Sequence, residues 1–247
     1  MKQPPWLIAP PGSLDEGAPV ELEPAEAAHL AGPLRGRLGD RVVLIDGEGV
    51  VADARVIRLG KRAVVAEVAG IHRLPKSPGD GVTLGLAVIE RQPMDWAVQK
   101  AVEVGVGRFV PLVSDRTQRA RSSADRRLEH WQRLARQALK QCRRPWAMAI
   151  DEPSTLEDFL RQGSASAGVF GDQAGQPLGE CLESRPESLL IGPEGGFTSD
   201  EVDRLRGGGW TGVSFGIHVL RAETAAVVGS AMLLSLIHIS EPTRPTR

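Results

Sequence analysis

The segment from Leu190 to Glu201 constrains the fold of this chain more than any other. It runs Leu-Ile-Gly-Pro-Glu-Gly-Gly-Phe-Thr-Ser-Asp-Glu and follows an apolar run that starts at Ser188. That run predicts a buried strand, and Thr198 with Glu201 forms a capping box that opens a helix. A strand, a glycine loop and a helix N-terminus in this order let the backbone approach a small ligand closely, although a simple tight turn explains the loop equally well. The glycine spacing fits neither the dinucleotide-binding pattern nor the phosphate-loop pattern, which argues against NAD and ATP.

A second strand and loop of the same kind follow further along the chain. Val213–Phe215 predicts a short strand, the next residues run Gly-Ile-His-Val-Leu-Arg-Ala-Glu-Thr-Ala, and an apolar helix is expected from Ala226 to Leu234. Two such loops in one parallel sheet lie side by side at the carboxyl ends of its strands, where open α/β sheets bind ligands. The pair therefore favours a binding pocket over two unrelated turns.

The remaining pattern divides the chain near residues 74–81, a segment dense in turn residues. Valine-rich strands joined by short turns precede it and predict a small β-barrel. After it, apolar strands alternate with helices, which predicts a parallel sheet covered on both faces. The expected strands are 41–46, 50–59 and 62–68 before the linker, and 82–89, 109–113, 146–150 and 167–171 after it, with a helix from about Met94 that ends at Gly105.

Charge is distributed unevenly along the 247 residues, although the net charge is only −1. Arg116–Arg144 contains ten basic and two acidic residues, whereas Asp151–Asp203 contains two basic and twelve acidic ones. The basic segment is a candidate phosphate-binding surface. An apolar stripe that includes Leu128 and Trp131 equally predicts an ordinary solvated helix with one face on the sheet.

Composition excludes several classes of protein. The two cysteines are far apart in sequence and the histidines are not clustered, which argues against a zinc site, or any other metal site, and against a disulfide framework. A reducing, cytoplasmic location is therefore expected. No secretory signal and no membrane-spanning run is apparent in the sequence. Aromatic residues make up 4% of the chain, too few for a base-stacking surface that binds single-stranded RNA.

The glycine loop resembles a known family when it is taken together with five other segments. The sequence Gly-Pro-Glu-Gly-Gly-Phe, followed by Phe-Gly-Ile-His-Val-Leu-Arg-Ala-Glu-Thr-Ala, is similar to the C-terminal half of the bacterial 16S rRNA (uracil-N3)-methyltransferases of the SPOUT, or α/β-knot, superfamily. Four earlier segments agree with the family in order: His29–Asp40, Val98–Val106, Ser114–Thr117 and Ala138–Arg143. The chain departs from the family pattern at Ile217 and His218, where proline and arginine are usual.

The resemblance implies an architecture and partners. It implies an α/β fold in which residues 82–234 form a parallel sheet with a C-terminal trefoil knot, preceded by a PUA-like RNA-binding β-barrel at residues 1–73. Residues 235–247 have no family counterpart and are expected to be an atypical tail, disordered or of read-through or artificial origin, and frayed from about Ser240. The family binds S-adenosyl-L-methionine, acts on 16S rRNA of the small ribosomal subunit and works as a homodimer.

The resemblance also implies site residues. Arg116 and Arg143 lie at loop or helix ends of the basic segment and are therefore the expected catalytic donors, which stabilise the negative charge that develops on uracil O2 and O4 when N3 loses its proton. Either of them is also a candidate phosphate anchor. RNA binding is expected at Arg35, Arg37, Arg116, Arg119, Arg143 and Arg144. Cofactor binding is expected at Leu190, Ile191, Gly192, Pro193, Glu194, Gly195, Gly196, Phe215, Gly216, Ile217, Val219, Leu220, Arg221, Glu223, Thr224 and Ala225.

Three functions remain open at this point. The first is cofactor-dependent methylation of uridine N3 in the small-subunit rRNA. The second is a related methyltransferase that acts on tRNA or on a ribose 2′-hydroxyl, and the third is an RNA-binding assembly factor that no longer binds the cofactor. Binding of S-adenosylmethionine separates the third from the other two.

Overall fold

The computed structural model describes residues 3–60, 63–161, 168–181 and 186–239, and the chain divides into two compact units. The first unit comprises Met1–Lys76 and Arg136–Ala147, and the second comprises Ser77–Ala135 and Met148–Arg247. The boundary at Lys76 lies inside the expected linker. The sequence-based division assigned residues 136–147 to the second domain, but in the structure they belong to the first unit. Side chains of this segment donate hydrogen bonds there to Glu23, Glu26 and Gln3.

The first unit is a five-stranded sheet with one helix. Its strands lie in the order β1-β3-β4-β5-β2, with β1 parallel to β3 and the other pairs antiparallel. In β4 the residues Val50, Ala52, Ala54 and Val56 are buried, while the residues between them are more exposed. This alternation turns one face of the sheet toward a core that also takes in α1. The elements are β1 Trp6–Ile8, β2 Pro19–Glu21, α1 Pro24–Ala31, β3 Arg41–Ile45, β4 Val50–Leu59 and β5 Val64–Arg73.

The second unit is built on a parallel sheet. Its strands lie in the order β12-β10-β11-β6-β7-β8, with β9 also pairing with β7, and each described pair is parallel. The strands are β6 Thr83–Ala87, β7 Arg108–Val113, β8 Ala149–Ile150, β9 Ser154–Thr155, β10 Val169–Pro177, β11 Ser188–Ile191 and β12 Thr211–Ser214. The helices are η1 Pro78–Gly81, α2 Arg91–Val104, η2 Asp115–Ala120, α3 Arg121–Cys142, α4 Leu156–Arg161, η3 Leu178–Cys181, α5 Ser199–Gly207 and α6 Ala222–Ile239.

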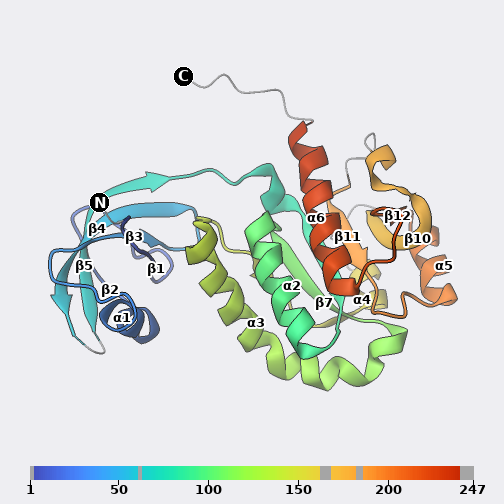
Figure 1. Cartoon of the computed structure of the whole chain (residues 1–247), viewed down its shortest axis with the longest axis horizontal. Coiled ribbons are helices and arrows are strands. Elements are labelled where there is room, and N and C mark those ends of the chain that lie inside the picture. Colours follow the sequence, from blue (N-terminus) through green and yellow to red (C-terminus); the bar gives the residue numbers. More distant parts are fainter. Residues whose placement is uncertain (1–2, 61–62, 162–167, 182–185, 240–247) are drawn as a thin grey trace. The chain divides into compact units, whose positions relative to one another are not determined.

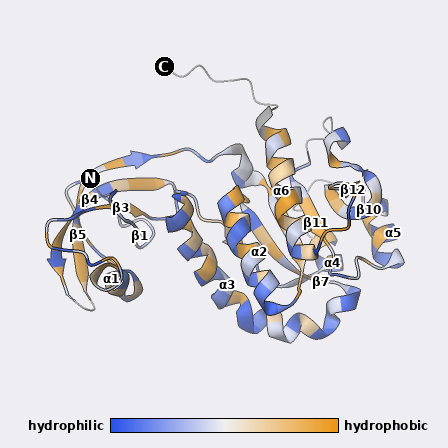
Figure 2. Cartoon of the chain, in the orientation of Figure 1, coloured by the Kyte–Doolittle hydropathy of each residue, from blue (hydrophilic) through white to orange (hydrophobic). Residues whose placement is uncertain are grey.

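Helices cover both faces of this sheet (Figure 1). Helices α2 and α6 pack against each other, and α6 also packs on β11 and β6. On β11, Leu190 belongs to a core shared with α4 and α5, while the neighbouring Leu189 lies against Gly229 of α6. Adjacent residues of a strand point to opposite faces, so β11 is buried on both sides. Figure 2 shows the apolar character of these strands and the many hydrophilic residues of α3.

The parallel α/β sheet expected from the sequence is confirmed, with small differences at the ends of elements. Helix α2 ends where predicted, because Gly105 takes up a left-handed conformation with φ 109°. Helix α6 runs to Ile239, so residues 235–239 of the expected tail are helical. Residues 62 and 167, where two expected strands begin, and residues 240–247 lie outside the described residues. Within the described part of the chain, none of the helices combines the length and apolar character needed to cross a membrane.

Candidate functional site

A pocket lies at the carboxyl ends of β11 and β12 and beside the middle of β10, the strand between them in the sheet. The glycine loop after β11 and the loop after β12 both contribute to it, as does the segment at Gly171–Gln173 in β10. The pocket is lined by Gly171, Asp172, Gln173, Ile191, Gly192, Pro193, Glu194, Gly196, Val213, Ser214, Phe215, His218, Val219, Leu220, Ala222 and Ala225. Its position matches the general site of ligand binding in open α/β sheets.

The glycine loop is closed on itself by short contacts. Gly196 has φ 70° and donates its N–H to the carbonyl of Pro193 at 2.7 Å. A Cβ at Gly192 would lie 2.9 Å from the nitrogen of Phe197, which is closer than side-chain atoms normally approach backbone. Both positions therefore need glycine, the first because of its conformation and the second because of the close approach of two backbone segments.

A buried carboxylate joins this loop to the segment after β7. Glu201 is 1% exposed, and its two oxygens accept hydrogen bonds from the backbone N–H groups of Asp115 and Thr198, each at 2.8 Å. Arg116 follows Asp115 and donates from Nη1 to the carbonyl oxygen of Gly196 at 3.2 Å. The capping residue of α5 thus holds η2, and with it Arg116, against the glycine loop.

The lining of the pocket combines apolar side chains with two carboxylates. Ile191, Phe215 and Leu220 provide apolar surface. Asp172 and Glu194 provide negative charge, and Asp172 is fixed by Arg206 Nη2 at 3.2 Å and by the N–H of Ala174 at 3.0 Å. Such a site suits a ligand with a flat apolar ring, hydroxyl groups and positive charge.

The structure brings most of the expected cofactor residues to this one pocket. Those in the lining are Ile191, Gly192, Pro193, Glu194, Gly196, Phe215, Val219, Leu220 and Ala225; those outside it are Leu190, Gly195, Gly216, Ile217, Arg221, Glu223 and Thr224. Sequence reasoning missed the segment Gly171–Gln173, as well as Val213, Ser214, His218 and Ala222. Only the start of the missed segment had a signal in the sequence, because an expected strand of the same parallel sheet ends at Gly171.

The expected catalytic and RNA-binding arginines do not lie together in one unit. Arg116 and Arg119 belong to η2 of the second unit, whereas Arg35, Arg37, Arg143 and Arg144 belong to the first. Arg143 has φ 58°, donates to Gln3 Oε1 at 2.6 Å, and holds its guanidinium carbon 5.9 Å from the ring centre of Trp6. Its expected catalytic role stays a prediction, while Arg116 contacts the glycine loop directly.

Metal ligands are not grouped in the part of the chain that the structure describes. Among those residues, no three or more histidine, cysteine, aspartate or glutamate side chains are arranged to hold an ion.

Comparison with known proteins identifies the family of this chain. A family model described as RNA methyltransferase domain matches residues 75–234, which include the whole pocket. The chain belongs to this RNA methyltransferase family. Its matched segment begins at the linker, so it covers the parallel sheet with all the strands that border the pocket.

Relatives within the family have names that specify an RNA. A ribosomal RNA small subunit methyltransferase E from Aquifex aeolicus is 31% identical over 76% of this chain and 82% of its own length. The protein of the same name from Synechocystis is 29% identical over 94% of this chain and 77% of its own. The family resemblance seen in the sequence motifs is thereby confirmed.

Solved structures of the family share the whole fold. A methyltransferase from Legionella pneumophila, in complex with the bound cofactor SAM, has a TM-score of 0.86 at 25% identity and covers 95% of this chain and 98% of its own. A ribosomal RNA small subunit methyltransferase E from Neisseria gonorrhoeae, bound to S-adenosyl methionine, has a TM-score of 0.85 at 28% identity with the same coverage.

Proposed function

We propose that this protein transfers the methyl group of S-adenosylmethionine to N3 of a uridine in the 16S rRNA of the small ribosomal subunit. Membership of the RNA methyltransferase family supports the reaction class, and the names of the relatives support the RNA. Two solved relatives carry the cofactor. The observation that carries the proposal is the pocket in which the glycine loop, the loop after β12 and the middle of β10 meet.

The residues of this pocket fit the proposed cofactor. Ile191, Phe215 and Leu220 offer apolar surface for an adenine ring, and the tightly closed backbone of the glycine loop offers polar groups for its edge. Asp172 and Glu194 offer acceptors for the ribose hydroxyls and a negative field for a cationic sulfur. When bound, the cofactor supplies a methyl group on that sulfur.

The proposal includes the fold features of the family that bear on the site. In a trefoil knot the C-terminal segment threads a loop of the same chain, which holds two loops around one ligand; the shared pocket of the loops after β11 and β12 supports this arrangement. In the first unit, the five-stranded sheet with α1 supports a PUA-like RNA-binding domain. We also propose a homodimer that works in the cytoplasm, where ribosomal subunits are assembled.

In the proposed reaction the protein positions its reactants and stabilises charge. The loops fix the methyl donor, so that much of the rate comes from orientation. The N3 proton of uridine leaves to solvent, and the negative charge spreads onto O2 and O4. Arg116 lies beside the glycine loop and is the donor that we place against this charge. Arg35, Arg37, Arg119, Arg143 and Arg144 are assigned to the RNA, with Arg143 a second candidate for the charge on uracil.

Calorimetry and mass spectrometry test this function in sequence. Titration with S-adenosylmethionine is expected to release heat with one site per chain, and no binding by the folded protein would leave an RNA-binding assembly factor. Small subunits that lack the modification are then incubated with protein and cofactor, and the digested rRNA is analysed by mass spectrometry. N3-methyluridine in 16S rRNA is the expected product, whereas a methyl group on tRNA or on a ribose hydroxyl would overturn the assignment.

A further inference from the structure

A second pocket, rich in arginine, lies on the same edge of the parallel sheet. It is formed by the residues after β6, the first turn of α2, the end of η2 and the first half of α3, and measures about 530 Å³. We call it the arginine pocket; its lining is Val88, Ile89, Glu90, Arg91, Ala120, Ser123, Arg126, Arg127, His130 and Arg133. Nothing in the proposed reaction has so far used it.

The position of the arginine pocket places it next to the proposed cofactor site. It adjoins the carboxyl ends of β6 and β7, whereas the cofactor pocket adjoins those of β11 and β12. Strands β6 and β11 are neighbours in the sheet, so the two pockets follow one another along one edge. Between them lies η2, whose Arg116 contacts the glycine loop and whose Ala120 lines the arginine pocket.

The arginine pocket carries an excess of positive charge. It presents four arginines and a histidine, and Glu90 is the acidic residue in its lining. Asp95 lies behind it and accepts from Arg127 at 3.0 Å and from His130 at 2.9 Å. Within the described residues, neither Arg126 nor Arg133 has a carboxylate or hydrogen-bond partner. An exposed pair of unpartnered guanidinium groups is poised to bind an external anion.

The inner part of the arginine pocket is rigid. Arg127 donates from Nη2 to Asp95 and to the carbonyl of Arg91, and its guanidinium carbon lies 4.8 Å from the ring centre of Trp131. The indole N–H of Trp131 donates to the same Asp95 oxygen at 3.1 Å. Arg127 Nε is buried and has no acceptor among the described residues. Because these contacts already hold the Arg127 side chain in place, less conformational entropy is lost when a ligand binds.

The arrangement suits a chain of phosphates better than a single anion. Arg126 and Arg133 are two helical turns apart on α3, about 10 Å along its axis. A row of charges over that length can follow successive phosphodiesters of one strand. Among the described residues that line the pocket there is no phenylalanine, tyrosine or tryptophan, and charged groups predominate, so charge carries the recognition more than base stacking does.

We infer that the arginine pocket binds the phosphodiester backbone of the substrate RNA beside the target nucleotide. The inference rests on the proposed function, since it takes the ligand to be the RNA that is methylated. It adds residues that the family motifs do not mark, and it gives α3 two faces, one that packs on α2 through Trp131 and one that binds RNA.

Fluorescence anisotropy with a labelled single-stranded RNA tests the inference. The double variant Arg126→Gln/Arg133→Gln is expected to raise the dissociation constant roughly tenfold. The slope of log affinity against log salt should fall by about 1.4, the value for two lost contacts with a single strand. Because both side chains are exposed and unpartnered, the variant should keep its melting temperature, and its affinity for S-adenosylmethionine should stay within twofold by calorimetry.

Two controls keep the result specific. Arg161→Gln removes one positive charge from α4, where Arg161 pairs with Glu157 and Asp158 of its own helix, and should change RNA affinity by less than twofold. Inorganic phosphate should displace the RNA less effectively than unlabelled RNA with the same phosphate content. Equal displacement, or an unchanged affinity and salt slope in the double variant, would overturn the inference. A wild-type protein that binds RNA through these arginines but transfers no methyl group would instead refute the proposed function.

Discussion

Gly192 occupies the point where the glycine loop folds back on itself. A methyl group there would lie 2.9 Å from the nitrogen of Phe197 and 3.0 Å from the carbonyl carbon of Gly196, so the loop would have to open. Gly192→Ala is expected to weaken binding of S-adenosylmethionine at least tenfold, roughly 1.4 kcal/mol, measured by calorimetry. Gly207→Ala at the end of α5, where a Cβ meets nothing within 4 Å, is the matched control and should bind normally. Equal affinities for the two variants would show that the close approach of the backbone is not the reason why residue 192 is a glycine.

Asp95 joins α2 to α3 through hydrogen bonds from Arg127, His130 and Trp131. Burial raises the pKa of Asp95, but hydrogen bonds and the charges of His130 and Arg127 outweigh burial, so the pKa lies below its ordinary value of 3.8. A lowered pKa means that the carboxylate stabilises the fold at neutral pH, and that this contribution is lost as the pH falls below that ordinary value.

The loss of unfolding free energy caused by Asp95→Asn should therefore become smaller as the pH falls. At about pH 7 the variant should lose about 2 kcal/mol of unfolding free energy, because an amide offers one acceptor to donors that now share two oxygens. The deficit should shrink as the pH falls below 3.8 and through the lowered pKa of the folded carboxyl, because the wild-type side chain then becomes protonated as well. Urea denaturation of both proteins at a series of pH values measures the difference in their unfolding free energies. A difference that is constant with pH would contradict the ionised role of Asp95.

Helix α5 connects two segments of the site through its third residue. Glu201→Gln keeps the shape of that side chain but places an amide NH₂ against one of the backbone N–H groups of Asp115 and Thr198. Because a buried donor then faces a donor, we expect a loss of about 2 kcal/mol in unfolding free energy and weaker cofactor binding. Asp200→Asn, at the neighbouring exposed position, should stay within about 0.5 kcal/mol of wild type. A Glu201→Gln protein with wild-type stability and affinity would show that the link does not position the loop.

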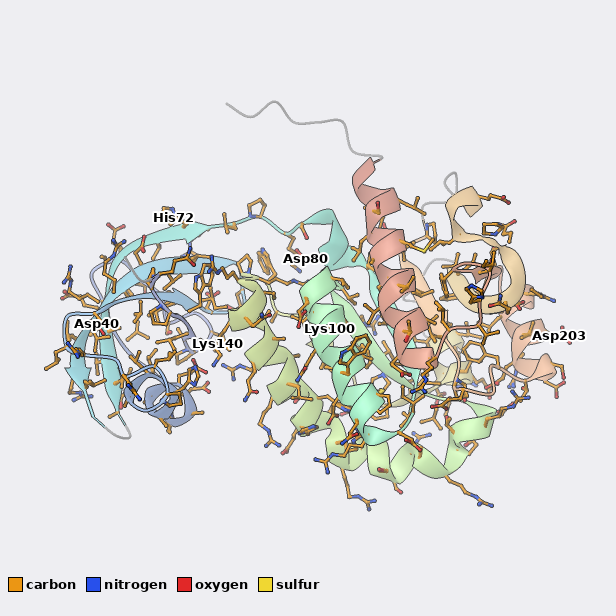
Figure 3. The ribbon with its side chains drawn as sticks, in the orientation of Figure 1. Asp40, His72, Asp80, Lys100, Lys140 and Asp203 are labelled. Carbon is orange, nitrogen blue, oxygen red and sulfur yellow. The ribbon has the colours of Figure 1, made fainter. Side chains whose placement is uncertain are left out.

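The last turns of α3 belong to the first unit, where Lys140, labelled in Figure 3, donates to Glu26 at 2.6 Å. The side chains of this pair are only 15% and 9% exposed, whereas Arg136 and Glu23 nearby are both 42% exposed. Lys140→Ala leaves a buried carboxylate without its cation and is expected to cost about 3 kcal/mol. Arg136→Ala should cost less than about 1 kcal/mol. Chemical denaturation compares the two, and similar losses would mean that burial does not set the strength of these pairs.

The strands and helices of the second unit could be predicted because their apolar runs and caps are local signals. Thr198 and Glu201 identify the start of α5, and Gly105 identifies the end of α2. The share of β10 in the pocket was missed because Asp172 reaches it through a register shift between Gly171 and Gln176, which depends on pairing with β12. The placement of residues 136–147 was missed for a similar reason, since contacts distant in sequence decide it.

The low net charge of the chain implies that RNA binding depends on a local concentration of basic side chains. A net charge of −1 gives no general attraction to a polyanion, so affinity has to come from concentrated groups such as those of the arginine pocket. Acidic residues follow in the segment 151–203, which includes Asp172 and Glu194 of the cofactor pocket. One edge of the sheet thus presents a basic pocket suited to a phosphate backbone and an acidic pocket suited to a cationic methyl donor.

The loop after β12 carries the most exposed large apolar side chains of the described chain, Ile217 at 88% and Val219 at 81%. Apolar groups held in water beside a pocket mark a contact surface, and we expect them to be covered in the proposed homodimer. Wild-type protein should then sediment at twice the chain mass of 26.5 kDa. Ile217→Asp/Val219→Asp should shift it to the single-chain mass, because two buried charges oppose association. Ile57→Asp, at a position 45% exposed on β4, is the control and should leave the dimer intact. A double variant that still sediments as a dimer would place the subunit contact elsewhere.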